Sequence, residues 1–187
     1  MLFRGLHLIT LDAKGRMAMP ARLRGIVESH CQGQLVVTID QDGESLVIYP
    51  LNEFEEIERK VAALSSFHPE SKRLKNIFIG HATEVNLDSS GRILIPLNLR
   101  QFVGLDKKAA LVGQGNKLAV WNDEAWNETR DGWLKHKVNT EELPEELKKL
   151  SLEKVEVRLK FKGRCGDCDH AASKRTVGTG GCCISNK

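Results

Sequence analysis

The sequence of 187 residues has no uninterrupted apolar run of 18 residues, which is about the length that a membrane-spanning helix requires. Near the start, Arg4, Asp12 and Lys14 interrupt the apolar residues, so no apolar core of a secretory signal is present there. We therefore expect no membrane partner and a cytoplasmic location.

The sequence also lacks the short motifs on which common enzyme classes depend. It contains no Gly-x-Ser-x-Gly, no Walker phosphate loop and no two histidines four residues apart. Gly113 and Gly115 form a Gly-x-Gly without the third glycine of a nucleotide-binding loop. His81 lies close to Glu84, and we expect it to be a turn or core histidine. The sequence therefore predicts no enzyme and no cofactor.

A general excess of positive charge is absent as well. The net charge of +3 is misleading, because residues 153–187 hold eight basic and four acidic residues. The first 152 residues carry 20 basic and 21 acidic side chains, which gives no global argument for a nucleic-acid partner. Positive charge is instead local, because residues 1–24 contain five basic side chains and Asp12 as their one acidic side chain. The basic residues are Arg4, Lys14, Arg16, Arg22 and Arg24.

What the sequence does contain is one stretch of 14 residues twice. Residues 11–24 (LDAKGRMAMPARLR) and 87–100 (LDSSGRILIPLNLR) agree at seven of 14 positions with an offset of 76. A self-match that keeps glycine, proline and charged residues in register is typical of a duplicated structural unit. The identical pairs are Leu11/Leu87, Asp12/Asp88, Gly15/Gly91, Arg16/Arg92, Pro20/Pro96, Leu23/Leu99 and Arg24/Arg100.

Each copy predicts a tight turn, a strand and a short helix, in that order. The aspartate can accept a hydrogen bond from the backbone two residues on, and the glycine tolerates a positive φ. Proline ends the strand and can begin the helix. The expected strands are 16–20 and 92–96, and the expected helices are 21–28 and 97–105. Arg16 and Arg92 follow the turns, where each could pair with its own aspartate or be available to a partner.

The remaining elements follow from hydrophobic periodicity and turn residues. Asp42-Gly43 predicts a hairpin, and Asn52 with Glu55 predicts a capping box at the start of a helix. Trp126 and Trp133 lie seven residues apart on one helix face, as anchors of the core or of a subunit interface. The expected strands are 34–40, 45–49, 81–87, 109–113 and 117–121, and the expected helices are 52–66, 69–79, 123–137 and 143–150.

Four of the five cysteines fall in residues 153–187, namely Cys165, Cys168, Cys182 and Cys183. A zinc site built from Cys165, Cys168, His170 and Cys182 is one interpretation, and a redox Cys-x-x-Cys is another. Adjacent Cys182 and Cys183 fit the second half of a zinc finger poorly. We therefore expect a disordered or non-native tail without metal. Cys31, in contrast, is expected to be a small core residue.

Several motifs resemble those of one protein family. They are Phe3-Arg4-Gly5, the pairs Asp12/Arg16 and Asp88/Arg92, Tyr49-Pro50-Leu51 and Gly80-His81-Ala82. Over residues 1–152 the chain resembles the MraZ family of bacterial transcriptional regulators. The resemblance implies an α+β fold of tandem duplicated AbrB-like swapped-hairpin β-barrel domains with flanking helices. The implied divisions are 1–68 and 69–142 for the two domains, 143–152 for a short terminal helix and 153–187 for the tail.

The resemblance also implies a function. MraZ-like proteins form rings, commonly octameric, and bind direct repeats in the double-stranded DNA upstream of their own cell-division and cell-wall gene cluster. We therefore expect a sequence-specific, nucleoid-associated transcriptional regulator whose partners are DNA and further copies of itself. The alternative is a ring-forming interaction protein in which both Asp-x-x-x-Arg motifs are structural.

Local charge favours the first copy as the one that reads DNA, because the second has Ser90 and Asn98 where the first has basic residues. An arginine fork can grip a phosphate or a guanine edge, and a glycine lets its backbone approach closely. The residues expected to contact DNA are Lys14, Gly15 and Arg16. Those expected to contact phosphate, or to form intramolecular ion pairs, are Arg4, Arg22 and Arg24. Those expected to be structural or secondary DNA-binding residues are Asp12, Asp88, Gly91 and Arg92.

Overall fold

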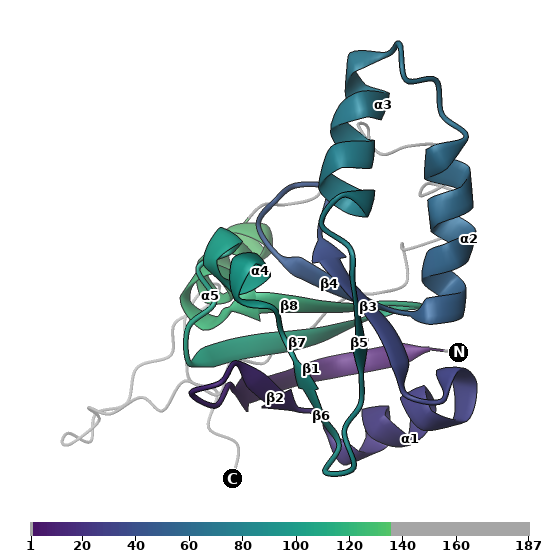
Figure 1. The fold of residues 1–187 in the computed structure, drawn as a ribbon. Coiled ribbons are helices and arrows are strands. Elements are labelled where there is room, and N and C mark those ends of the chain that lie inside the picture. The colour runs from purple at the N-terminus through teal and green to yellow at the C-terminus, as the bar shows by residue number, and fades with distance from the viewer. Residues whose placement is uncertain (1, 136–187) are drawn as a thin grey trace, which may run out of the picture. The chain divides into compact units, whose positions relative to one another are not determined.

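Both copies of the repeat contribute to one antiparallel sheet in the computed structural model, which describes residues 2–135 (Figure 1). The strands are β1 Phe3–Thr10, β2 Arg16–Ala18, β3 Gln34–Ile39, β4 Leu46–Pro50, β5 Thr83–Asn86, β6 Arg92–Leu94, β7 Lys108–Gly115 and β8 Leu118–Asn122. The helices are α1 Ala21–Cys31, α2 Leu51–Ala62, α3 Pro69–Leu74, the π-helix η1 Lys75–Ile79, α4 Leu97–Phe102 and α5 Asp123–Lys135. The expected helix 143–150 and the expected tail, with Cys165, Cys168, His170 and Cys182, lie outside the described residues.

The order of the six strands exchanges the leading strands of the two copies. The order is β1-β7-β8-β4-β3-β5, and every neighbouring pair is antiparallel. β1 precedes the first turn but pairs with β7 of the second copy, with Leu6 opposite Val112. β5 precedes the second turn but pairs with β3 of the first copy, with Val36 opposite Glu84. One copy of roughly 70 residues is near the lower limit for an independent core, and the shared sheet removes that limit.

No strand was predicted for residues 3–10, although β1 is one of the two longest strands of the described chain. Its sequence, FRGLHLIT, lacks a clean alternation of apolar and polar residues. Leu8 is 72 % exposed, so an apolar residue lies on the outward face where a polar one would be expected. The partner strand β7 is also about 100 residues further along the chain, so a local sequence pattern could not predict this pairing.

Each face of the sheet has its own apolar core. One core lies between the sheet, the short strands β2 and β6, and α1, and it contains Val37 of β3. The other contains Val36 of β3 and is covered by α2, η1 and α5. The predicted core role of Trp126 is confirmed, whereas Trp133 is exposed. The ring centroid of each lies about 6 Å from that of Trp121.

The expected capping box was wrong. β4 continues to Pro50, which is the residue preceding α2, so Asn52 lies inside the helix and no side chain caps its start. Proline already has the backbone φ that a helix start requires. The helix predicted at 69–79 is confirmed in extent, but its last five residues form η1. An unpredicted cap begins α5, where Asn122 accepts hydrogen bonds from the backbone of Glu124 and Ala125.

Candidate nucleic-acid interface

Asp12 organises the first turn with both of its carboxylate oxygens. Oδ1 accepts hydrogen bonds from the backbone N–H groups of Lys14 and Arg16, each at 2.9 Å. Oδ2 accepts a hydrogen bond from Nε of Arg16 at 2.7 Å, which makes an ion pair. The backbone N–H of Arg16, more than its side chain, lowers the pKa of Asp12 from its ordinary value. The predicted aspartate turn is therefore confirmed.

The second turn repeats this arrangement. Asp88 Oδ1 accepts hydrogen bonds from the backbone of Ser90 at 2.8 Å and of Arg92 at 2.9 Å. Its Oδ2 accepts a hydrogen bond from Nε of Arg92 at 3.1 Å, and the pKa of Asp88 is lowered by the same causes in the same order. The turn glycines both have positive φ, +82° at Gly15 and +71° at Gly91.

Behind the turns, β2 and β6 pair with each other as a two-stranded antiparallel ribbon. Arg16 lies opposite Leu94, and Ala18 lies opposite Arg92. Met17 and Ile93 between them point into the core and are buried. Because side chains alternate along a strand, Arg16, Ala18, Arg92 and Leu94 share the outward face, which we call the arginine ribbon.

The arginine ribbon brings together the two arginines that the sequence places 76 residues apart. Arg16 and Arg92 occupy diagonal positions of the ribbon, which are roughly 7–8 Å apart in an antiparallel pair. Their side chains are 32 % and 36 % exposed. Each arginine donates a hydrogen bond from Nε to its own aspartate. No Nη nitrogen of either arginine has a hydrogen-bond partner within residues 2–135. The ends of both guanidinium forks are therefore available to an external acceptor.

Lys14 and Arg22 lie near opposite ends of the arginine ribbon, and both are exposed. The turn that carries Lys14 lies beside the end of β6. There the backbone N–H of Ile95 donates a hydrogen bond to the carbonyl of Gly15 at 3.0 Å. Arg22 is in the first turn of α1. Met19, just before that helix, donates at 2.9 Å to the carbonyl of Gly91 in the second turn. Figure 1 shows this second turn, between β5 and β6, close to α1.

Arg4 is not part of this group. It lies near the start of β1, whereas the first turn follows the other end of that strand. Six residues of extended chain between Arg4 and Thr10 correspond to roughly 20 Å. Arg4 is exposed and lies opposite Gln114 of β7.

Arg24 and Gly15 have surroundings that the sequence did not suggest. The guanidinium of Arg24 lies against Gly91, and its Nη2 donates to the carbonyl of Met19 at 3.3 Å. Gly15 is buried, and the guanidinium of Arg100 fills the space beside it. The close approach that glycine permits is therefore made, at both turns, by an arginine of the same chain. The sequence signal for this pairing was the repeated Pro-x-x-x-Arg, Pro20 to Arg24 and Pro96 to Arg100.

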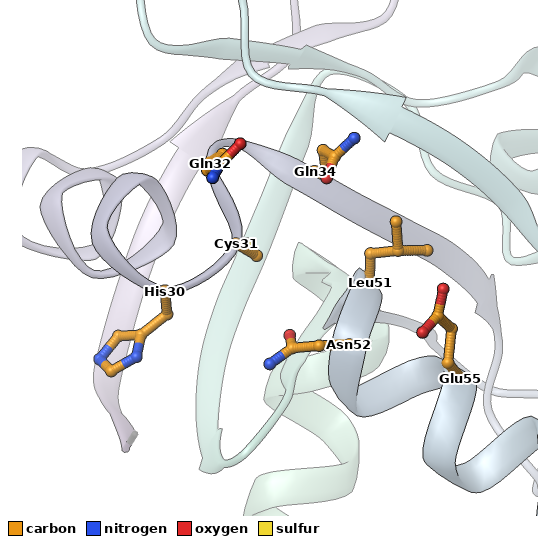
Figure 2. Close-up of a pocket in the computed structure, with 7 residues that line it drawn as sticks. All are labelled: His30, Cys31, Gln32, Gln34, Leu51, Asn52 and Glu55. Carbon is orange, nitrogen blue, oxygen red and sulfur yellow. The ribbon is translucent and has the colours of Figure 1, made fainter.

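The described part of the chain contains an open hollow but no cluster of potential metal ligands. Within residues 2–135, no three His, Cys, Asp or Glu side chains are grouped so that they could hold a metal ion. One open hollow of about 310 Å³ lies between the end of α1 and the start of α2, and Figure 2 shows polar side chains such as His30 and Asn52 around it. Cys31 at its edge is buried, donates to the carbonyl of Val27 at 3.1 Å, and has a pKa raised by desolvation. Its predicted core role is confirmed.

None of the helices described in residues 2–135 combines the length and the apolar character needed to cross a membrane.

Comparison with known proteins gives a consistent result. A family model described as "MraZ protein, putative antitoxin-like" matches residues 2–77 and again residues 78–156. A protein of Halorhodospira halophila is 48 % identical over 152 residues, which cover 81 % of this chain and all of the relative. Relatives from Coxiella burnetii and Pseudomonas putida are 49 % and 47 % identical, again with 81 % of this chain and all of each relative covered. All three relatives carry the name transcriptional regulator MraZ.

Proposed function

The chain belongs to the MraZ family, and from that premise we propose that it is a sequence-specific DNA-binding regulator of transcription. Its target is a set of direct repeats upstream of its own operon, in a cell-division and cell-wall gene cluster, and the protein is cytoplasmic and nucleoid-associated. The names of its relatives support a role in transcription. No enzymatic activity and no cofactor belong to this proposal.

The observation that carries the DNA-binding proposal is the arginine ribbon. A two-stranded β-ribbon can enter the major groove, and a guanidinium fork can donate two hydrogen bonds to O6 and N7 of guanine. The available Nη groups of Arg16 and Arg92 on one outward face suit that contact. Lys14 and Arg22 near the two ends of the ribbon suit phosphate contacts on either side, which would fix the register.

We assign the reading role chiefly to Lys14 and Arg16, whereas Gly15, which Arg100 covers, shapes the turn that carries them. The first turn carries the basic residues, and Asp12 holds Arg16 in place without engaging its Nη groups. Arg92 has the matching position in the second turn and takes a secondary role, with Asp88 and Gly91 as its scaffold. Arg4, on the far part of β1, is assigned at most a separate phosphate contact.

The finer architecture is part of the same proposal. The exchanged pairing of β1 with β7 and of β5 with β3 supports two AbrB-type swapped-hairpin domains, over residues 1–68 and 69–142. Copies of the chain assemble into a ring, which we propose is octameric. Linking several weak DNA contacts through one ring raises avidity by about 10²–10⁴ when the repeats are suitably spaced.

The proposal is tested by measuring the affinity of the wild type and of Arg16→Ala for the direct-repeat duplex and for a scrambled duplex, across a series of salt concentrations. We expect the wild type to prefer the repeats, with a fall of about 0.9 log units of affinity per log unit of salt for each phosphate contact. Arg16→Ala should lose binding by roughly 1–3 kcal/mol while keeping its size in solution. Arg59→Ala, an exposed arginine on α2, is the matched control and should bind like the wild type.

The ion pairs Arg16–Asp12 and Arg92–Asp88 favour one competing function. In it, both motifs only stabilise the turns of a ring-forming interaction protein. Dissociation of Arg16→Ala into smaller species would support this alternative, and a wild type without preference for the repeats would remove the DNA-binding proposal.

A further inference from the structure

Each turn glycine is covered by an arginine from the other copy of the repeat. A Cβ atom at Gly15 would occupy the space of the Arg100 guanidinium, and a Cβ atom at Gly91 would occupy that of Arg24. Both glycines are buried, although they belong to turns whose neighbouring residues are exposed. The arrangement is reciprocal, because the first copy supplies Arg24 to the second turn and the second copy supplies Arg100 to the first.

Short local contacts hold each arginine in this position. Arg100 Nε donates to the carbonyl of Ile95 at 3.1 Å, and the N–H of the same Ile95 donates to the carbonyl of Gly15 at 3.0 Å. One residue therefore anchors both the turn and the guanidinium that covers it. Met19 has the equivalent position at the second turn, with Arg24 Nη2 at 3.3 Å from its carbonyl and its own N–H bonded to Gly91.

These two arginines differ from Arg16 and Arg92 in their partners. Neither Arg24 nor Arg100 forms an ion pair within the described residues, and Nε of Arg24 is buried without a hydrogen-bond partner there. A partly buried cation without a carboxylate is costly, so its position requires a reason. The planar guanidinium packs against the face that a glycine without a side chain leaves open.

We propose that Arg100 and Arg24 are positioning residues that act across the repeat, each holding the turn of the opposite copy in the shape that presents its lysine or arginine to DNA. The proposal rests on the proposed DNA-binding function and deepens it. Affinity depends on how precisely a contact residue is held. A loosely held side chain keeps its charge but makes its contacts in poorer geometry. The second copy therefore contributes to reading by the first turn through Arg100.

The two possible roles of Arg100, positioning and direct phosphate contact, predict opposite rankings of two variants. Arg100→Lys keeps the positive charge but loses the planar group and Nε. Arg100→Gln loses the charge but keeps a planar group and a donor nitrogen at the same number of bonds along the side chain as Nε. For a positioning residue we expect Gln to retain more affinity for the direct-repeat duplex than Lys, with Lys weaker than wild type by roughly tenfold. The salt dependence of both variants should match that of the wild type.

A second measurement reports on the conformation of the turns in the absence of DNA. We expect Arg100→Lys to accelerate amide hydrogen exchange at Lys14, Gly15 and Arg16 by roughly tenfold and to leave Ser90 and Arg92 unchanged. Arg24→Lys should show the reverse pattern. Arg22→Lys, on the exposed face of α1, is the matched control and should change neither turn.

The outcomes are distinct. The proposal is overturned if Lys retains affinity better than Gln, if Arg100→Ala lowers the salt slope by about 0.9 with unchanged turn amides, or if exchange changes only in the variant's own copy. If the wild type shows no preference for the direct repeats, the proposed function fails, and the crossed exchange pattern alone decides whether Arg100 positions the turn. Size in solution, measured for each variant, separates these effects from loss of assembly.

Discussion

The first and second turns have almost the same backbone and hydrogen bonds but carry different charges. Asp12 and Asp88 make the same three hydrogen bonds, and all of them lie between 2.7 and 3.1 Å. The first copy adds Lys14 and Arg22, where the second has Ser90 and Asn98. Geometry of the turn therefore cannot make one copy a better DNA reader than the other. The difference must come from the side chains that the shared scaffold presents.

The helices that follow the turns differ more than the turns do. α1 has 11 residues and buries Leu23, Val27 and Cys31, whereas α4 has six residues and buries Leu99. The extra residues of α1 come after the part that the two copies share. Change in length is tolerated there because it leaves the arginine ribbon and both turns in place.

The largest expected effect tests the equivalence of the two copies in the core. Leu23 and Leu99 occupy matching positions and are 1 % and 0 % exposed. We expect Leu23→Ala and Leu99→Ala each to lower the free energy of unfolding by about 2–5 kcal/mol, because each leaves a cavity in one shared core. Urea unfolding at a fixed protein concentration measures this. A negligible loss in either variant would show that the copies do not share the core equally.

A smaller effect is expected for DNA binding by the second turn. Arg92→Ala should weaken binding to the direct repeats by less than Arg16→Ala, for which we expect roughly 1–3 kcal/mol. The reason is that the second turn lacks the neighbouring basic side chains. Titration of both variants in the same buffer compares them. Equal losses would mean that the arginine ribbon reads DNA with both of its arginines, and the asymmetry between copies would be abandoned.

Basic side chains introduced into the second copy would show whether its turn approaches phosphates. Ser90→Lys combined with Asn98→Arg gives the second copy the basic side chains of the first. We expect tighter binding and a salt slope steeper by up to about 0.9 for each new phosphate contact. The control is Ser90→Gln with Asn98→Gln, which adds length without charge. An unchanged slope in the basic variant would show that the second turn does not approach phosphates.

The smallest effect concerns pH. The turn N–H groups lower the folded-state pKa of Asp12 and Asp88 below the ordinary 3.8, so the stabilisation is present above 3.8 and is lost as pH falls through the folded values. The wild type should therefore lose thermal stability in acid. Asp12→Asn with Asp88→Asn should be less stable at neutral pH and lose less in acid, as seen in melting curves between about pH 5 and pH 2. Parallel curves for the two proteins would refute this role for the carboxylates.

Much of the local structure could be predicted from the sequence, because its causes lie within a few residues. The hydrogen bonds that Asp12 accepts come from residues no more than four positions away, and the helix start after Pro20 is equally local. The wrong prediction of a cap at Asn52 also has a local reason, because Pro50 directly precedes α2 and places Asn52 inside the helix. The strand β1 was missed because its partner strand β7 is far away in the sequence. In addition, its exposed leucines interrupt the alternation of apolar and polar residues that is typical of a strand.

The amino-acid sequence is sufficient to show that the chain contains two copies of one unit, roughly where the turns and helices of residues 2–135 lie, and which family the chain resembles. The tertiary structure alone decided that the copies exchange their leading strands, that Arg16 and Arg92 share one face, and that Arg24 and Arg100 cover the glycines of the opposite copy. Hydrogen bonds within a turn are encoded by neighbouring residues. Pairing across about 76 residues depends on which surfaces can be buried together, and that is a property of the whole folded chain.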